Sequence, residues 1–166
     1  MYEVGEYIVH PGQGVCKVDG ITEGDSPNYL LMPVGSRHPM RISFPVASEG
    51  RLRRVLTSEE ARSIIAEYPT MEPEGFTDRS NALEEEHFKN EIRRGSCRDT
   101  VRVAKTFRHR IAQVRANNRK PPVSYERIYK QASERSLEEL AVALGTSQED
   151  VASMFQALEG EDVRAN

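Results

Sequence analysis

The chain has 166 residues, of which 37% are hydrophobic and 30% are charged, and its formal net charge is -3 at pH 7. This length allows one medium domain or two small ones. No apolar run approaches the roughly 20 residues of a membrane span. The N-terminus lacks the pattern of a signal peptide, and 2 cysteines cannot form a disulfide framework. We therefore expect a soluble, cytoplasmic protein that has no membrane partner.

Short strands separated by tight turns are expected in the first third of the chain. Apolar and aromatic residues come near alternation over residues 2–9, and the cluster at 10–14 predicts a turn in which Gly12 and Gly14 adopt positive φ. Further strands are expected within 15–21, at 29–34 and at 40–46. So many short strands in so few residues predict a small, bent β-barrel of the SH3 or Tudor type.

The pattern becomes helical after Thr57, where Thr57 and Glu60 have the spacing of a capping box. A Pro- and Glu-rich stretch at 68–75 is expected to link a domain at 1–70 to a domain at 71–166. The helices of the second domain are expected at 79–94, at 98–115 and from a cap at Ser124 to Gly145. A last helix should follow a capping box at 146–149, with a core face made of Val151, Met154, Phe155 and Leu158. The expected fold class is α+β: an N-terminal Tudor/SH3-like barrel followed by an all-helical bundle.

Charge is strongly segregated along the sequence. Residues 89–130 hold 13 Lys and Arg against 3 Asp and Glu, a balance of +10, whereas 71–88 and 131–166 have balances of -5 and -6. A basic block of this kind suits a polyanion, because Lys and Arg displace the counterions condensed on phosphates. The alternative is a helix that has one solvated basic face.

We find no catalytic or metal-binding motif. The four histidines show no zinc-site spacing and are expected to be solvated; they are His10, His38, His87 and His109. Cys16 is expected to be a small buried hydrophobe. Glu84, Glu85 and Glu86 are interpreted as a solvated helix start, because consecutive helix positions point in different directions. We expect no enzyme activity, no cofactor, no metal and no small-molecule substrate.

The opening of the chain resembles the N-terminal signature of the CarD/CdnL family of bacterial transcription factors. The resemblance is carried by Val4-Gly5-Glu6 and by His10-Pro11-x-x-Gly14. The strand at 41–46 with its Pro45, the stretch Phe88-Lys89-x-x-Ile92-x-x-Gly95 and the segment from Ser124 to Gly145 are also similar to the family. The likeness covers nearly the whole chain and is most specific in the first 15 residues.

This resemblance implies a Tudor-like domain that binds the β subunit of RNA polymerase. It also implies a helical domain that contacts promoter DNA without reading sequence and stabilises the open complex. We expect the protein to be monomeric. The residues expected at the polymerase surface are Leu31, Met32, Arg41, Ile42, Ser43 and Phe44. The residues expected to contact phosphates are Arg79, Lys89, Arg93, Arg94, Arg98, Arg102 and Lys105.

The family typically places a Trp near the start of the helical domain, where it wedges into the DNA minor groove. This chain has no Trp, and Phe76 occupies about the same place. An inserted Phe can also wedge between base steps. The alternative is that Phe76 belongs to the linker and packs on the helices.

Two other interpretations remain open. Residues 137–151 have the spacing of a helix-turn-helix operator binder, although the second helix would begin with the acidic stretch 148–150. The chain could also be a protein-interaction module whose basic helices are only scaffold.

Overall fold

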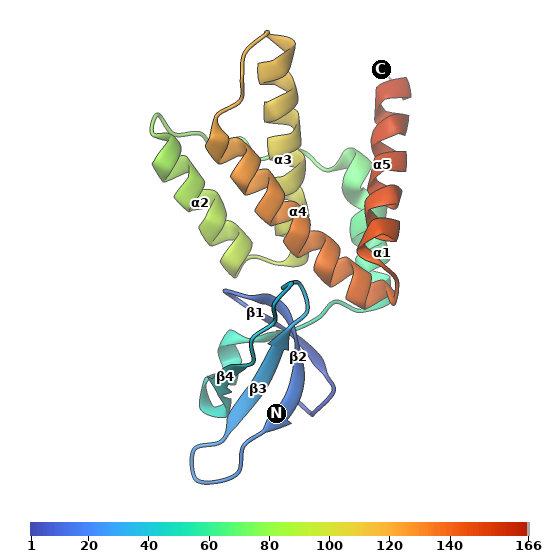
Figure 1. Ribbon diagram of the computed structural model, residues 1–166. Helices are drawn as coiled ribbons and strands as arrows, with labels where there is room; N and C mark the ends of the chain where they lie inside the picture. The colour runs from blue at the N-terminus through green and yellow to red at the C-terminus, as the bar shows by residue number, and fades with distance from the viewer. Residues whose placement is uncertain (166) are drawn as a thin grey trace. The chain divides into compact units, whose positions relative to one another are not determined.

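The computed structural model describes the backbone of residues 1–165 and the side chains of residues 1–160. It confirms the α+β class, with a β unit at Met1–Thr57 and a helical unit that begins at Ser58 (Figure 1). We expected the two domains to divide at residue 70, which lies further along the chain than the observed division after Thr57. The units divide earlier because α1 (Ser58–Glu67) packs on α4, and the short 3-10 helix η2 (Tyr68–Thr70) packs on α5.

The β unit is a five-stranded antiparallel sheet in the order β4-β3-β2-β1-β5. Its strands are β1 (Tyr7–His10), β2 (Gly14–Ile21), β3 (Asn28–Pro33), β4 (Ile42–Pro45) and β5 (Arg53–Arg54). A 3-10 helix, η1 (Val46–Arg51), connects β4 to β5. The sheet surrounds a core of Ile8, Cys16, Val18, Tyr29, Leu31, Phe44 and Leu52, as expected of a small SH3- or Tudor-like barrel.

The first strand begins later than the sequence pattern suggests. Residues before Tyr7 form a turn in which the Glu6 N–H donates to the Glu3 carbonyl (3.1 Å) and Gly5 has a φ of 91°. Within β1 the fully buried side chain is Ile8, whereas Tyr7 is 39% exposed. The near-alternation at 2–9 therefore mixes a turn with a short strand.

The turn between β1 and β2 is held by His10, which is not the solvated side chain that we expected. His10 Nδ1 accepts hydrogen bonds from the N–H groups of Gly12 (3.0 Å) and Gln13 (3.2 Å). The His10 ring also packs edge-on against Phe44, with centroids 5.4 Å apart. Gly14 has the expected positive φ, 77°, but Gly12 does not.

The helical unit is built around α4 (Val123–Leu144), which contacts the other four α-helices (Figure 1). These are α1, α2 (Asn81–Arg94), α3 (Cys97–Ala116) and α5 (Gln148–Ala165). Helices α2, α3 and α4 share a core of Phe88, Ile92, Val103, Phe107, Ile128 and Ala132.

The helix ends follow local chemistry, with two corrections. Gly145 ends α4 in the left-handed conformation, at a φ of 66°, as expected. The N-cap of α4 is Pro122 rather than Ser124, which lies buried in the first turn. The N-cap of α5 is Ser147 rather than Thr146. The Ser147 hydroxyl accepts a hydrogen bond from the Asp150 N–H (3.1 Å). On α5, Val151 is fully buried, but Met154 is 41% exposed and leaves the expected core face.

Candidate interaction surfaces

Strand β4 forms one outer edge of the sheet and, in the described part of the chain, pairs only with β3. The Val46 N–H donates to the Pro27 carbonyl (3.1 Å) just beyond the paired residues. Bonded and non-bonded pairs alternate along an antiparallel ladder. The pair Leu30–Ser43 is therefore non-bonded, and the Ser43 N–H and C=O point to the outer edge. The backbone of Pro45 has the same outward orientation. The N–H that proline lacks would therefore not have bonded to β3.

The six residues expected at the polymerase surface divide into three groups. Leu31 and Phe44 are buried in the core of the β unit, so they support the strand from within. Met32 and Ile42 are half-buried. Arg41 and Ser43 are exposed and can meet a partner.

Arg41 is anchored in a specific direction by Asp19. Its Nη2 atom lies 3.5 Å from Asp19 Oδ2 in a largely exposed ion pair. Asp19 sits in β2 at an irregularity in the β2–β3 register, between Val18 and Gly20, where an extra residue bulges. The bulge thus orients a cation beside the free edge of β4.

In the helical unit, three of the seven cations expected to contact phosphates instead hold the segment that leads out of α1. They lie on one face of α3. Arg98 forms a bidentate ion pair with Glu67, and the Arg102 Nε donates to the Glu72 carbonyl (2.9 Å). Lys105 is only 4% exposed, and its Nζ donates to the Tyr68 carbonyl (2.5 Å). Burial of its ammonium argues against a phosphate contact by Lys105.

Arg110, further along α3, also holds the segment that follows α1. It donates to the carbonyls of Glu74 (3.1 Å) and Phe76 and pairs with Glu84 (3.1 Å). Its guanidinium lies 5.3 Å from the ring centroid of Phe88 and 5.0 Å from that of Phe107. Much of the charge of the basic block is therefore satisfied within the unit.

Phe76 is half-buried and packs on the helices. Its ring stacks on His87, with centroids 3.7 Å apart and an interplanar angle of 17°, and meets Phe88 edge-on at 6.0 Å. His87 is therefore also not the solvated residue that we expected. Because Arg110 holds the Phe76 carbonyl, the ring has a fixed position on the surface.

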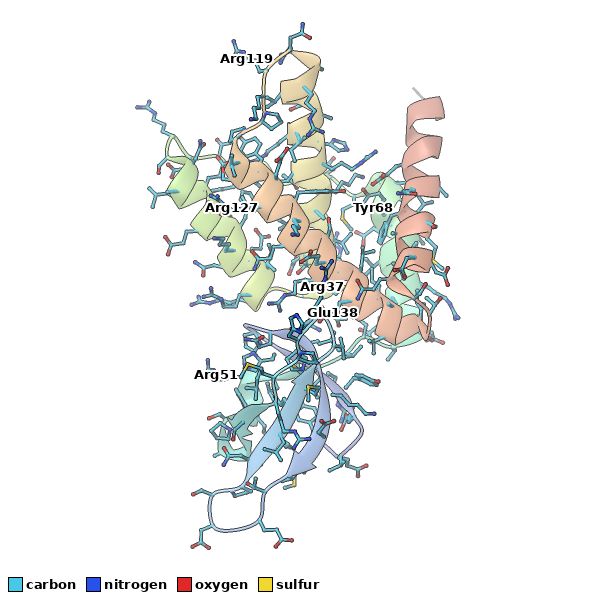
Figure 2. All side chains as sticks on the ribbon, viewed as in Figure 1. Arg37, Arg51, Tyr68, Arg119, Arg127 and Glu138 are labelled. Carbon is cyan, nitrogen blue, oxygen red and sulfur yellow. The ribbon has the colours of Figure 1, made fainter. Side chains whose placement is uncertain are left out.

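Lys89 pairs with Glu85 (3.1 Å) one turn earlier on α2, and Arg127 from α4 binds the same carboxylate through two hydrogen bonds of 2.9 Å (Figure 2). The bonds from Arg127, and to a lesser degree the Lys89 ammonium, lower the pKa of Glu85 to about 2. Glu84 and Glu85 are buried, at 3% and 8% exposure, so their interpretation as a solvated helix start is wrong. Their partners lie 26 and 42 residues away, where no local pattern reveals them.

We predict that Glu85→Gln lowers stability at neutral pH but not in acid. Because the folded state depresses this pKa, the stabilisation is fully present above about pH 4.5 and disappears as pH falls to about 2. The cationic partners are half exposed, so the effect should be small, about 2–4 °C in Tm. Thermal melts of both proteins from pH 7 to pH 2 measure it. A Tm difference that stays constant across this range would contradict the prediction.

The remaining expected cations are exposed. Arg79, Arg93 and Arg94 make no ion pair with a described residue, and the same holds for Arg119 and Lys120 in the turn between α3 and α4. Arg79 precedes α2 and Arg94 ends it, so the helix separates them by about 20 Å at 1.5 Å per residue. The expected set therefore does not form a single patch.

An apolar hollow in the helical unit is lined by Tyr68, Tyr129 and Phe155, among others. Its volume is about 160 Å³, below the roughly 300 Å³ at which small-molecule sites begin. Tyr68 donates to Glu159 across it (2.7 Å), and burial raises the pKa of this phenol above its usual value. The hollow is therefore a packing feature with a satisfied polar rim.

The exposed edge of β4 offers the main-chain groups that strand addition uses in protein recognition. Residues 2–56 match the family model of the CarD-like/TRCF RID domain. Over these residues, the β unit is thus similar to the CarD-like RNA polymerase-interacting domains. The family is one of interaction domains and not of enzymes. The helical unit lies outside the matched residues.

No curated protein matches the sequence closely enough to count as a relative. Within the described residues, no helix combines the length and the apolar character needed to cross a bilayer.

Proposed function

We propose that the β unit binds the β subunit of RNA polymerase by adding β4 to the edge of a sheet in that subunit. The observation that carries this proposal is the free edge of β4, where the Ser43 N–H and C=O point outward. Main-chain hydrogen bonds would supply affinity in this mode, and neighbouring side chains would supply specificity. Arg41, held by Asp19, stands at the start of the edge and would set the register against an acidic group on the polymerase.

The helical unit, in this proposal, contacts promoter DNA through its exposed cations and stabilises the open complex. Arg93 and Arg94 are adjacent, exposed and free of internal ion pairs among the described residues, which suits phosphate contacts that carry no sequence information. Phe76 would meet the upstream edge of the bubble with the part of its ring that His87 leaves uncovered. The protein would act in the cytoplasm as a monomer.

One observation favours a competing function. Arg98, Arg102, Lys105 and Arg110 are all committed to internal partners, as the scaffold interpretation would require. In that case the β unit alone would bind a partner, and the helices would serve as scaffold. The helix-turn-helix interpretation gains no such support, because α5 begins with exposed acidic residues at 149 and 150.

The experiment that separates these functions measures binding of the full chain to forked duplex DNA as a function of salt. We predict that the double variant Arg93→Gln/Arg94→Gln reduces the slope of log K against log salt by about 1.8, because each lost phosphate contact removes about 0.9. The double variant Arg98→Gln/Arg102→Gln removes the same charge from internally paired positions and serves as the matched control. Equal slopes in all three proteins would favour the scaffold function.

The same DNA in complex with polymerase tests Phe76. Phe76→Ala should shorten the lifetime of the open complex, and Phe76→Trp should lengthen it, because the indole offers a larger face for stacking. Circular dichroism of both variants checks that the helical unit is intact. Lifetimes that match the wild type in both variants would restrict Phe76 to a packing role.

A further inference from the structure

One cluster in the helical unit is used neither by the strand edge nor by the exposed cations. Glu74, His87 and Glu91 each offer one ligand atom, and these atoms all lie within 4.8 Å of one another. His87 and Glu91 are four residues apart on α2 and therefore share a face, while Glu74 approaches from the segment that precedes the helix. His87 Nε2 and Glu91 Oε2 are 3.7 Å apart.

The atoms that face the centre of this cluster are unsatisfied. His87 Nε2 and Glu91 Oε2 are shielded from solvent and have no hydrogen-bond partner among the described residues. Buried polar atoms in native proteins are nearly always paired, and these two lie 3.7 Å apart, beyond hydrogen-bond distance but close enough to share a bound ion. A pair of carboxylates beside an imidazole nitrogen is a donor set that attracts a cation.

The electrostatics of the cluster favour a positive ligand. Burial and the neighbouring carboxylate of Glu74 raise the pKa of Glu91 to about 7, and Asp99 adds to the effect. Arg102 opposes the shift, but its charge has the smallest influence and its Nε is bound to the Glu72 carbonyl. The two carboxyl groups thus lie close together with little positive charge beside them, a setting that suits a bound cation.

Two of the three residues are also held in place by their surroundings. The Glu74 N–H donates to the Thr106 hydroxyl (2.8 Å) and its carbonyl accepts from Arg110 (3.1 Å), so both sides of this residue's backbone are fixed. The His87 ring is fixed by its stack on Phe76 and by its edge contact with Phe88, at 4.9 Å. Supporting contacts of this kind orient ligands before the metal binds.

We propose that Glu74, His87 and Glu91 form a binding site for a divalent transition-metal ion of the Zn²⁺ class. An imidazole with two carboxylates suits Zn²⁺ better than Mg²⁺, which prefers an octahedral set of oxygens. Tetrahedral bonds of about 2.1 Å place ligand atoms about 3.4 Å apart, so the 3.7 Å between His87 and Glu91 needs only a small closure. Three protein ligands leave the fourth position to water. The ion would clip the segment that carries Phe76 to helix α2.

The test is a calorimetric titration of the full chain, freed of metal by a chelator, with Zn²⁺ and separately with Mg²⁺. We expect one Zn²⁺ per chain, no Mg²⁺ binding at the same concentrations, and at least tenfold weaker Zn²⁺ binding in Glu91→Gln and in Glu74→Gln. The matched controls, Glu86→Gln on the exposed face of α2 and His38→Gln in the β unit, should bind as the wild type does. Wild-type affinity in Glu91→Gln, or an equal loss in the controls, overturns the proposal.

A second measurement does not depend on how well the variants fold. Substituted Co²⁺ should give the visible absorption of a nitrogen and oxygen site in the wild-type chain. A thiolate charge-transfer band would assign the metal to Cys16 or Cys97, both of which are buried cysteines, and would overturn the proposal. Neither measurement uses polymerase or DNA, so failure of the metal site and failure of the proposed function are distinguishable.

Discussion

Ser43→Pro is expected to weaken binding of the chain to the polymerase β subunit at least tenfold while leaving the β unit folded. Proline removes the Ser43 N–H, which points to the outer edge of β4 and would be shared with the partner strand. The β3–β4 ladder loses nothing, because the pair Leu30–Ser43 is not hydrogen-bonded. A tenfold loss corresponds to about 1.4 kcal/mol, close to the net value of one hydrogen bond. Calorimetry with the isolated β-subunit lobe measures the change.

Ser43→Ala is the matched control, because it removes the hydroxyl and keeps the N–H. We expect this variant to bind as the wild type does. Arg41→Glu provides an independent check on the same edge, since it reverses the anchored charge, and should also abolish binding. If Ser43→Pro binds normally and melts normally, the polymerase must contact another face of the barrel.

Arg110→Met is expected to destabilise the helical unit by about 3–5 kcal/mol, the cost of leaving a buried charge without its partner. The variant leaves Glu84, which is 3% exposed, as a buried carboxylate without its cation. It also frees the carbonyls of Glu74 and Phe76 and removes the guanidinium from beside the rings of Phe88 and Phe107. Chemical denaturation followed by circular dichroism measures the loss.

The double variant Arg110→Met/Glu84→Gln separates the unpaired charge from the lost packing. If the buried carboxylate is the main cost, the double variant should recover a substantial part of the stability, whereas additive losses would assign the effect to the carbonyls and rings. Arg115→Met is the control, because its ion pair with Glu126 is exposed and should contribute under about 1 kcal/mol.

Features that depend on neighbouring residues could be predicted from the sequence. The turn at 10–14, the strand at β4 and the glycine that ends α4 all follow from side chains close to them in the chain. The buried stripe of α3 likewise follows from helical spacing, and its Phe107 and Ile111 are buried. The predicted helix starts are wrong by one or two residues. The N-caps are Pro122 and Ser147 rather than Ser124 and Thr146.

The binding partners of the charged side chains could not be predicted in this way. Helical spacing places Arg98, Arg102 and Lys105 on one face but does not tell whether that face meets DNA or the carbonyls of residues 68–72. The net charge of a segment likewise does not reveal the ion pairs that join Glu84 to α3 and Glu85 to α4. These contacts depend on the packing of whole helices, which a count of residues does not contain.

The hydrogen bonds that hold the backbone of residues 68–76 determine where the sequence of this segment can vary. Arg102, Lys105 and Arg110 donate to the main-chain carbonyls of Tyr68, Glu72, Glu74 and Phe76, and every amino acid carries a carbonyl. The donors on α3 are therefore constrained, whereas the exposed side chain of Glu72 can vary without loosening the attachment. A segment tied down through its backbone keeps its path along the bundle whatever side chain stands at such an exposed position.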